Sequence, residues 1–190
     1  MRAEKSALSE KHIVDDIREG RHEGQTEMVG RYARRVFAMI VRQVPDEMDA
    51  QELTQDVFMR AFSHIDSYNP QKASLSTWLC RIAYRLTLDF QKRKRALMVS
   101  IEDTEVGKTD ISDEELEAEL STGRKERIEQ LMDIVDSLPT DERMLLTLYY
   151  LEDRPLTEIA YITNIDAKAL ANRLFRTRKK LYKKLSPTVS

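Results

Sequence analysis

The sequence predicts an all-helical protein with two domains joined by a flexible linker. Its 190 residues include only five glycines and five prolines, and apolar residues recur at helical spacing without a convincing strand pattern. Charge also changes along the chain, since residues 96–125 hold nine acidic and three basic residues. Such a composition is typical of a solvated, mobile segment. We therefore expect a four-helix domain over residues 1–95, an acidic linker over 96–123 and a helix-turn-helix domain over 124–190.

Four amphipathic helices account for the first domain. The first covers residues 9–19 and stops near Gly20, and the second ends at Pro45. In the third, Asp49 and Glu52 stand at capping-box spacing. The inward residues of the second and third helices are Tyr32, Val36, Phe37, Ile40, Val41, Val44, Leu53, Val57, Ala61, Phe62 and Ile65. Stripes of this width predict a shared core.

A loop and a long fourth helix complete this domain. An Asn-Pro pair excludes helix from the loop over residues 67–72. The fourth helix begins near Ser74 and ends in four consecutive cations at 92–95. Its apolar stripe is Leu75, Trp78, Leu79, Ile82, Leu86 and Phe90.

Two surfaces of this domain have competing interpretations. Residues 67–95 mix aromatic and cationic side chains, a combination that suits unpaired bases and their phosphates. Trp78 and Phe90 fall on the apolar stripe and are expected in the core, which leaves Tyr68, in the loop, as the better candidate for a base contact. The charged outer face of residues 49–62, taken alone, indicates solvated surface.

The second domain is predicted to begin near Arg124. Pro139 breaks the chain, and Thr140 is expected to cap the next helix. Residues 155–185 then have the pattern of a short helix, a tight turn and a longer helix. This is the pattern of a helix-turn-helix.

The longer helix carries charge of one sign. Asn164 suits a left-handed turn and Asp166 suits an N-cap, and residues 167–185 contain eight bases and no acid. Leu170, Leu174, Leu181 and Leu185 are expected inside; Lys168, Ala169, Asn172, Arg173 and Arg176 are expected outside. Arg and Asn are the side chains that pair with guanine and adenine edges in the major groove. A DNA-reading helix is therefore predicted, with a solvated basic helix in an ordinary bundle as the alternative.

Other classes of function lack support in the sequence. The one cysteine, Cys80, cannot form a disulfide within the chain, as expected of a cytoplasmic protein. The three histidines lie apart without metal-ligand spacing, and phosphate-binding and nucleophile motifs are missing. We find neither a membrane-spanning run nor a signal peptide. We therefore expect no catalytic chemistry, metal, cofactor, small-molecule substrate or membrane insertion.

Three segments, in this order, carry a resemblance to a known family. They are DAQELTQDVFMRAF (49–62), LSTWLCRIAYRLTLDFQKRKR (75–95) and LPTDERMLLTLYYLEDRPLTEIAYITNIDAKALANRLFRTRKKL (138–181). Together they resemble the extracytoplasmic-function (ECF) sigma factors, two-domain members of the sigma-70 family of transcription initiation factors. The resemblance covers about residues 11–185, apart from the linker.

The resemblance implies three binding surfaces. The helix over 49–62 would bind the β′ clamp helices of core RNA polymerase through Asp49, Glu52, Leu53, Gln55, Asp56 and Phe58. The loop and fourth helix would bind the −10 element and a flipped base through Tyr68, Asn69, Lys72, Ser76, Thr77, Arg81 and Arg85. The last helix would read the −35 element through Lys168, Ala169, Asn172, Arg173, Arg176, Lys179 and Lys180.

The resemblance also implies the partners: core polymerase through its β′ clamp helices and β flap, promoter DNA, and an anti-sigma factor. The linker would thread towards the polymerase active site and RNA exit path. Arg85 stands where the family usually has Asn, Asn164 replaces the common Gly, and Ala169 and Ala171 replace frequent polar residues. The alternative is a helix-turn-helix regulator whose first 95 residues form a sensor or dimerisation domain.

Overall fold

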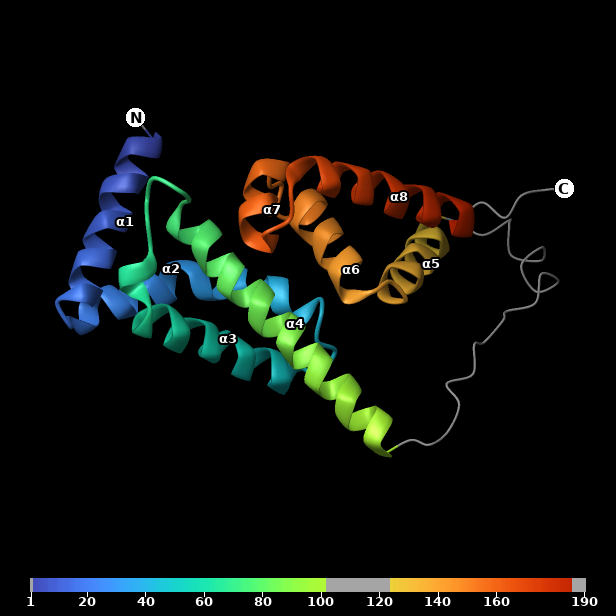
Figure 1. Ribbon diagram of the computed structural model, residues 1–190, viewed down its shortest axis with the longest axis horizontal. Coiled ribbons are helices and arrows are strands. Elements are labelled where there is room, and N and C mark those ends of the chain that lie inside the picture. The colour runs from blue at the N-terminus through green and yellow to red at the C-terminus, as the bar shows by residue number, and fades with distance from the viewer. Residues whose placement is uncertain (1, 102–123, 186–190) are drawn as a thin grey trace, which may run out of the picture.

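The computed structural model describes residues 2–101 and 124–185, and within these ranges every regular element is helical (Figure 1). The N-terminal elements are α1 (Arg2–Arg18), α2 (His22–Val41), α3 (Glu47–Ser63), a 3-10 turn η1 (Ile65–Ser67) and α4 (Leu75–Ile101). The C-terminal elements are α5 (Arg124–Asp136), α6 (Thr140–Leu146), a π-helical turn η2 (Thr147–Leu151), α7 (Leu156–Thr163) and α8 (Ala167–Leu185). The all-helical expectation is therefore confirmed.

Three element boundaries differ from expectation. Helix α1 begins at Arg2, although its first residue was expected at 9. Helix α4 continues to Ile101, so residues 96–101 are helical where the linker was expected to begin; the rest of that predicted linker lies outside the described residues. Helix α3 begins earlier than predicted, because the Asp46 carboxylate accepts hydrogen bonds from the Met48 and Asp49 amides. The N-cap is thus Asp46, and the capping box predicted at Asp49 was wrong.

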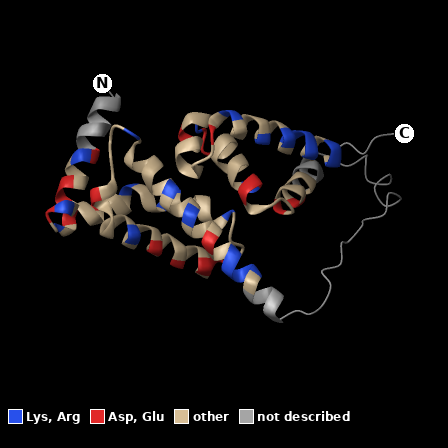
Figure 2. Ribbon diagram, in the orientation of Figure 1, with Lys and Arg blue, Asp and Glu red and all other residues tan. Residues whose placement is uncertain are grey.

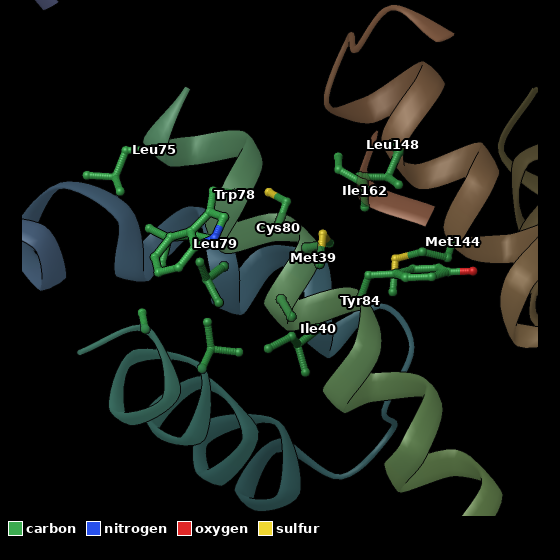
Figure 3. Packing of buried hydrophobic residues seen from close by; sticks show 14 of the residues in the cluster. Met39, Ile40, Leu75, Trp78, Leu79, Cys80, Tyr84, Met144, Leu148 and Ile162 are labelled. Carbon is green, nitrogen blue, oxygen red and sulfur yellow. The ribbon is translucent and has the colours of Figure 1, made fainter. Parts of the chain in front are cut away.

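The N-terminal helices share one apolar core. Met39 and Ile40 of α2 and Leu79 of α4 lie near one another there, whereas Leu75 lies further off at the start of α4; all four are fully buried (Figure 3). Helix α1 contributes Ile13, Val14 and Ile17, and α3 contributes Ala50, Leu53, Val57, Phe58 and Ala61. Trp78 is buried as predicted, and Phe90 is half-buried. The apolar stripes of the sequence therefore pack as their spacing indicated.

The C-terminal helices surround a second apolar cluster and contain the predicted helix-turn-helix. Its buried residues include Leu138, Met144, Leu145, Leu148, Ile159, Ile162, Leu170 and Leu174. Asn164 has φ 59° and ψ 33°, the left-handed conformation expected of the turn. The Asp166 carboxylate accepts hydrogen bonds from the Lys168 and Ala169 amides at 2.8 and 3.2 Å, so it caps α8 as predicted. The N-cap residue of α6 is Pro139 and Thr140 is its first helical residue, so the cap predicted at Thr140 was wrong.

The two groups of helices pack against each other through α4, which contacts both α6 and α7. Figure 3 shows Tyr84 and Cys80 of α4 on the side that faces the C-terminal helices, towards Met144 and Ile162. Tyr84 and Cys80 are both buried. Within the described ranges, no helix combines the length and apolar character needed to cross a bilayer.

Candidate nucleic-acid interface

An open hollow of about 960 Å³ lies where the loop after α3 meets the outer face of α4. Basic and aromatic side chains dominate its wall. The lining includes Arg60, His64, Tyr68, Asn69, Lys72, Trp78, Arg81, Arg85, Lys92 and, from α7, Tyr161. Five of the seven residues predicted to bind the −10 element therefore lie around one hollow. Its shape and cationic character suit an unpaired base with its phosphate.

Tyr68 lies in the wall of this hollow and is only 6% exposed. Its ring packs on Trp78 with centroids 5.5 Å apart, and its hydroxyl donates to Glu10 Oε2 at 3.5 Å. Burial, with a smaller contribution from the Glu10 charge, raises the pKa of Tyr68 to about 12. Tyr68 was expected to offer a free ring for contact with a base. In the structure its ring is instead packed into the wall of the hollow.

The cations of α4 lie at different depths. Arg85 is exposed at the hollow, whereas the Arg81 guanidinium lies over the Tyr161 ring at 4.7 Å from its centroid. A planar cation stacked on an aromatic ring is the arrangement that Arg also makes with a base. Asn69 accepts a hydrogen bond from the Gln71 amide at 2.8 Å and so shapes the loop.

Ser76 and Thr77 do not line the hollow, because they face the C-terminal helices. Thr77 is 1% exposed: it donates to Glu158 Oε2 at 2.8 Å and accepts from Arg154 Nη1 at 3.0 Å. Arg154 Nη2 also donates to Ser76 Oγ at 3.0 Å and to Cys80 Sγ at 3.2 Å. In this conformation Thr77 is inaccessible to DNA, contrary to the expected contact.

An ion pair between α2 and the C-terminal helices borders the contact of Arg154 with α4. Arg35 of α2 donates to Glu152 Oε2 at 2.6 Å. Burial by itself lowers the pKa of Arg35, but the hydrogen bond and charge of Glu152 outweigh it and raise that pKa. Burial raises the pKa of Cys80, and the Arg154 charge offsets only part of this. The polar part of the contact between the helix groups is therefore buried at Arg154, Thr77 and Cys80, and open to water at Arg35 and Glu158.

The outer face of α3 carries the residues predicted to bind polymerase. Figure 2 marks the acidic residues of α3 in red. Glu52, Gln55 and Asp56 are exposed, and Asp49 is half-buried with its Oδ2 accepting from Lys94 Nζ at 3.2 Å. Leu53 and Phe58 point inward and are buried in the core. The expectation that they contact a partner is therefore corrected: they hold α3 against the other N-terminal helices.

Sequence reasoning missed two methionines on this face. Met48 is 80% exposed and Met59 is 66% exposed. Their spacing from Glu52, Gln55 and Asp56 places all five residues on one side of the helix. Large apolar side chains left in solvent among charged ones mark interaction surfaces. Helical periodicity applied to Met as well as to the charged residues would have found them.

Helix α8 carries a run of basic residues, which Figure 2 marks in blue along its ribbon, and most of them are exposed. The exposed members of the predicted set are Lys168, Ala169, Asn172, Arg176, Lys179 and Lys180. Arg173 is half-buried and donates to Asp141 Oδ2 of α6 at 2.7 Å, which turns it from the outer face. Lys180 lies 3.5 Å from Glu142 Oε2. The free cationic face is therefore narrower than the sequence suggested.

Phe175 was also missed. It is exposed on α8 between Asn172 and Arg176 along the outer face, and Tyr182 is exposed about two turns further along. An aromatic residue on a basic helix face can contact thymine methyl groups or a protein partner. Among the residues that the structure describes, no cluster of His, Cys, Asp or Glu has the arrangement of a metal site.

Comparisons with known proteins agree on one family. Residues 28–97 match the model of Sigma-70 region 2, and residues 128–181 match the model of Sigma-70, region 4. The ECF RNA polymerase sigma factor SigM of Bacillus subtilis (strain 168) is 31% identical over 150 residues, covering 79% of this chain and 88% of SigM. SigW of the same organism is 28% identical over 185 residues, covering 92% and 96%.

Solved structures show the same fold. CnrH in complex with the cytosolic domain of CnrY superposes with a TM-score of 0.64 at 19% identity, covering 94% of this chain and 97% of CnrH. The sigma factor RpoE of Bartonella quintana, in complex with the anti-sigma factor NepR, gives a TM-score of 0.61 at 20% identity, covering 87% and 98%. On the sequence matches over both regions, this chain belongs to the ECF RNA polymerase sigma factors of the sigma-70 family.

Proposed function

We propose that this sigma factor divides its work between the two groups of helices. Residues 1–95 bind core polymerase and the melted −10 element, and residues 124–190 read the −35 element as duplex. The observation that carries this division is the pair of separate cationic surfaces: the hollow beside α4, and the exposed face of α8. The chain acts in the cytoplasm, by binding DNA and polymerase rather than by chemistry of its own.

The polymerase-binding surface is the outer face of α3. Glu52, Gln55 and Asp56 supply charge and hydrogen bonds for the β′ clamp helices, and Met48 and Met59 supply apolar contact at either end. An interface with an apolar part and a charged rim is both stable and selective. The C-terminal helices contact the β flap.

The hollow beside α4 receives a base from the non-template strand. Lys72 and Arg85 are exposed at its edge and hold the phosphates, while the Tyr68–Trp78 pair forms a rigid aromatic wall. Arg81 is placed to stack on the base once Tyr161 moves away. Arg85 has a longer side chain and more hydrogen-bond donors than the Asn usual in the family. The base preference at the −10 element therefore differs from that of family members with Asn.

DNA binding through Ser76, Thr77 and Arg81 requires the two groups of helices to separate. The C-terminal helices cover Ser76 and Thr77 through Arg154, and cover Arg81 through Tyr161. Polymerase binding supplies the energy, because the two regions then dock at different places on the enzyme. An anti-sigma factor, as in the structure of the Bartonella quintana sigma factor RpoE with NepR, is proposed to hold the free chain.

The rival interpretation, a helix-turn-helix regulator with a sensor domain, is not favoured, because region 2 of the sigma-70 family matches the very residues that the sensor would occupy. The division of labour is tested by selecting promoters from randomised DNA with reconstituted polymerase. The selected promoters should share two conserved blocks, the upstream −35 element and the downstream −10 element. Arg176→Ala should weaken sequence preference only in the −35 block, and Arg85→Ala only in the −10 block. Loss in the same block for both variants would contradict the division.

A further inference from the structure

One carboxylate on α1 joins both ends of the loop that lines the hollow. Glu10 Oε2 accepts from the Tyr68 hydroxyl at 3.5 Å, where the loop begins, and from the Leu75 amide at 3.1 Å, where it ends. Glu10 Oε1 accepts from the Tyr32 hydroxyl of α2 at 3.0 Å. Glu10 is itself half-buried, and its helix is anchored by the buried residues Ile13, Val14 and Ile17.

The inside of the loop is held by short local bonds. Asn69 accepts from the Gln71 amide at 2.8 Å through its side chain and from the Lys72 amide at 3.1 Å through its carbonyl. These bonds fix the shape of the turn but not its placement over α4. Arg18 also reaches the loop, with its Nε 3.4 Å from Asp66 Oδ1, but Asp66 is almost fully exposed and such pairs contribute little.

The charge of Glu10 suits its place at the start of α4. A carboxylate at a helix N-terminus is stabilised by the unpaired amides and the helix dipole. Hydrogen bonds to an ionised acceptor are also stronger than those between neutral groups. Burial, together with the Glu10 charge and hydrogen bond, raises the pKa of Tyr32 as well as of Tyr68, so both phenols remain donors.

We infer that Glu10 is a positioning residue for recognition of the melted −10 strand, acting through Tyr68 and the Leu75 amide without touching DNA. It lies before residue 28, where the match to region 2 begins. The inference rests on the proposed role of the hollow. It assigns to α1 the task of setting how far the loop lies from Arg81 and Arg85, and hence the width of the hollow.

The chain offers a built-in probe, because its one tryptophan, Trp78, packs on the Tyr68 ring. Glu10→Ala and Glu10→Gln are compared with Glu19→Ala, which removes the same charge from an exposed site just after α1. Acrylamide quenching of Trp78 fluorescence should increase in Glu10→Ala, less in Glu10→Gln, and not in Glu19→Ala. Thermal unfolding of each variant identifies any that fails to fold.

The functional readout uses holoenzyme with two DNA probes, a single strand of the −10 element and a duplex of the −35 element. Glu10→Ala should weaken single-strand binding about tenfold, the effect of losing a hydrogen bond to a charged group, and leave duplex binding unchanged. Glu10→Gln retains an acceptor oxygen, so its loss of single-strand binding should be smaller than that of Glu10→Ala. Combined with Tyr68→Phe, the losses should be less than additive, since both act through one contact.

Two results would overturn the assignment. One is that Glu10→Ala and Glu10→Gln both fold and both bind the single strand as tightly as the wild type does. The other is an equal loss of single-strand, duplex and core binding, which would make Glu10 a general stability residue. Arg85→Ala separates these from failure of the underlying proposal: if that variant also binds the single strand normally, the hollow is not the −10 site.

Discussion

Arg154 Nη1 donates a hydrogen bond to Thr77 Oγ1 at 3.0 Å, joining the chain segment before α7 to the first turns of α4. The same guanidinium reaches Ser76 and Cys80 and pairs with Glu158 at 2.8 Å. Arg154 is 6% exposed, and hydrogen bonds at such a buried site favour the arrangement of the elements that they join, although its Nε has no partner. Arg154 therefore stabilises a conformation in which part of the proposed −10 surface is covered.

Replacement of Arg154 by Ala is expected to loosen this contact. Cys80 is 1% exposed and is the chain's one thiol, so its rate of reaction with a thiol reagent reports separation of the helix groups. Loss of the guanidinium hydrogen bonds should raise that rate about tenfold or more. Arg178→Ala, on the exposed surface of α8, is the matched control. An unchanged rate would mean that Arg154 does not hold the two groups together.

Reversal of charge at Asp56 tests the polymerase-binding face. Asp56→Arg is expected to abolish capture of core polymerase while the far-ultraviolet circular dichroism and thermal midpoint stay unchanged, because Asp56 is exposed on α3. Met59→Lys should weaken capture too, by placing a charge in an apolar contact. Glu19→Arg, a like change away from α3, should have no effect. Normal capture by Asp56→Arg would remove α3 from the interface.

Arg176 tests the reading of the −35 element. On promoter duplex, Arg176→Ala should cost about 1–3 kcal/mol and relax preference at one base position if Arg176 binds a base edge. Arg178→Ala, two residues along and on another side of the helix, should leave that preference intact. Equal weakening of Arg176→Ala on all duplexes would instead make Arg176 a phosphate contact.

Tyr68 gives a prediction for alkaline pH. Its folded-state pKa is raised from 10.0 to about 12, so the folded protein disfavours the phenolate. The resulting stabilisation is complete below the unfolded pKa and is lost as pH rises through roughly 10 to 12. Burial also raises the pKa of Tyr32 and Tyr84, so absorbance at 295 nm should show one late-ionising phenol fewer in Tyr68→Phe than in the wild type, and the same number in Tyr182→Phe. Full ionisation of the wild type by about pH 11 would contradict the buried, Glu10-bonded Tyr68.

Much of the fold could be predicted because its signals are local. Asn164 and Asp166 act within one turn of chain, and the apolar stripe of α4 needs only its own spacing to be seen. The end of α4 was placed too early because cations and a composition change resemble a boundary, although neither breaks a helix.

The parts that could not be predicted depend on residues far apart in the sequence. Nothing in the local pattern around Thr77 shows that Arg154 covers it, or that Glu10 binds the Tyr68 hydroxyl. Leu53 and Phe58 were assigned to a partner by motif, although their helical position places them inside. A family motif records which residues recur, and both core and contact residues recur.

The central claim is that this chain directs core polymerase to promoters. It is tested most directly by transcription in vitro with purified core enzyme and promoters selected from randomised DNA. We predict that the chain yields transcripts with one defined start, that core alone yields none, and that Asp56→Arg abolishes them. Tight binding of the selected DNA by the chain without polymerase, together with no defined transcript in its presence, would contradict the account.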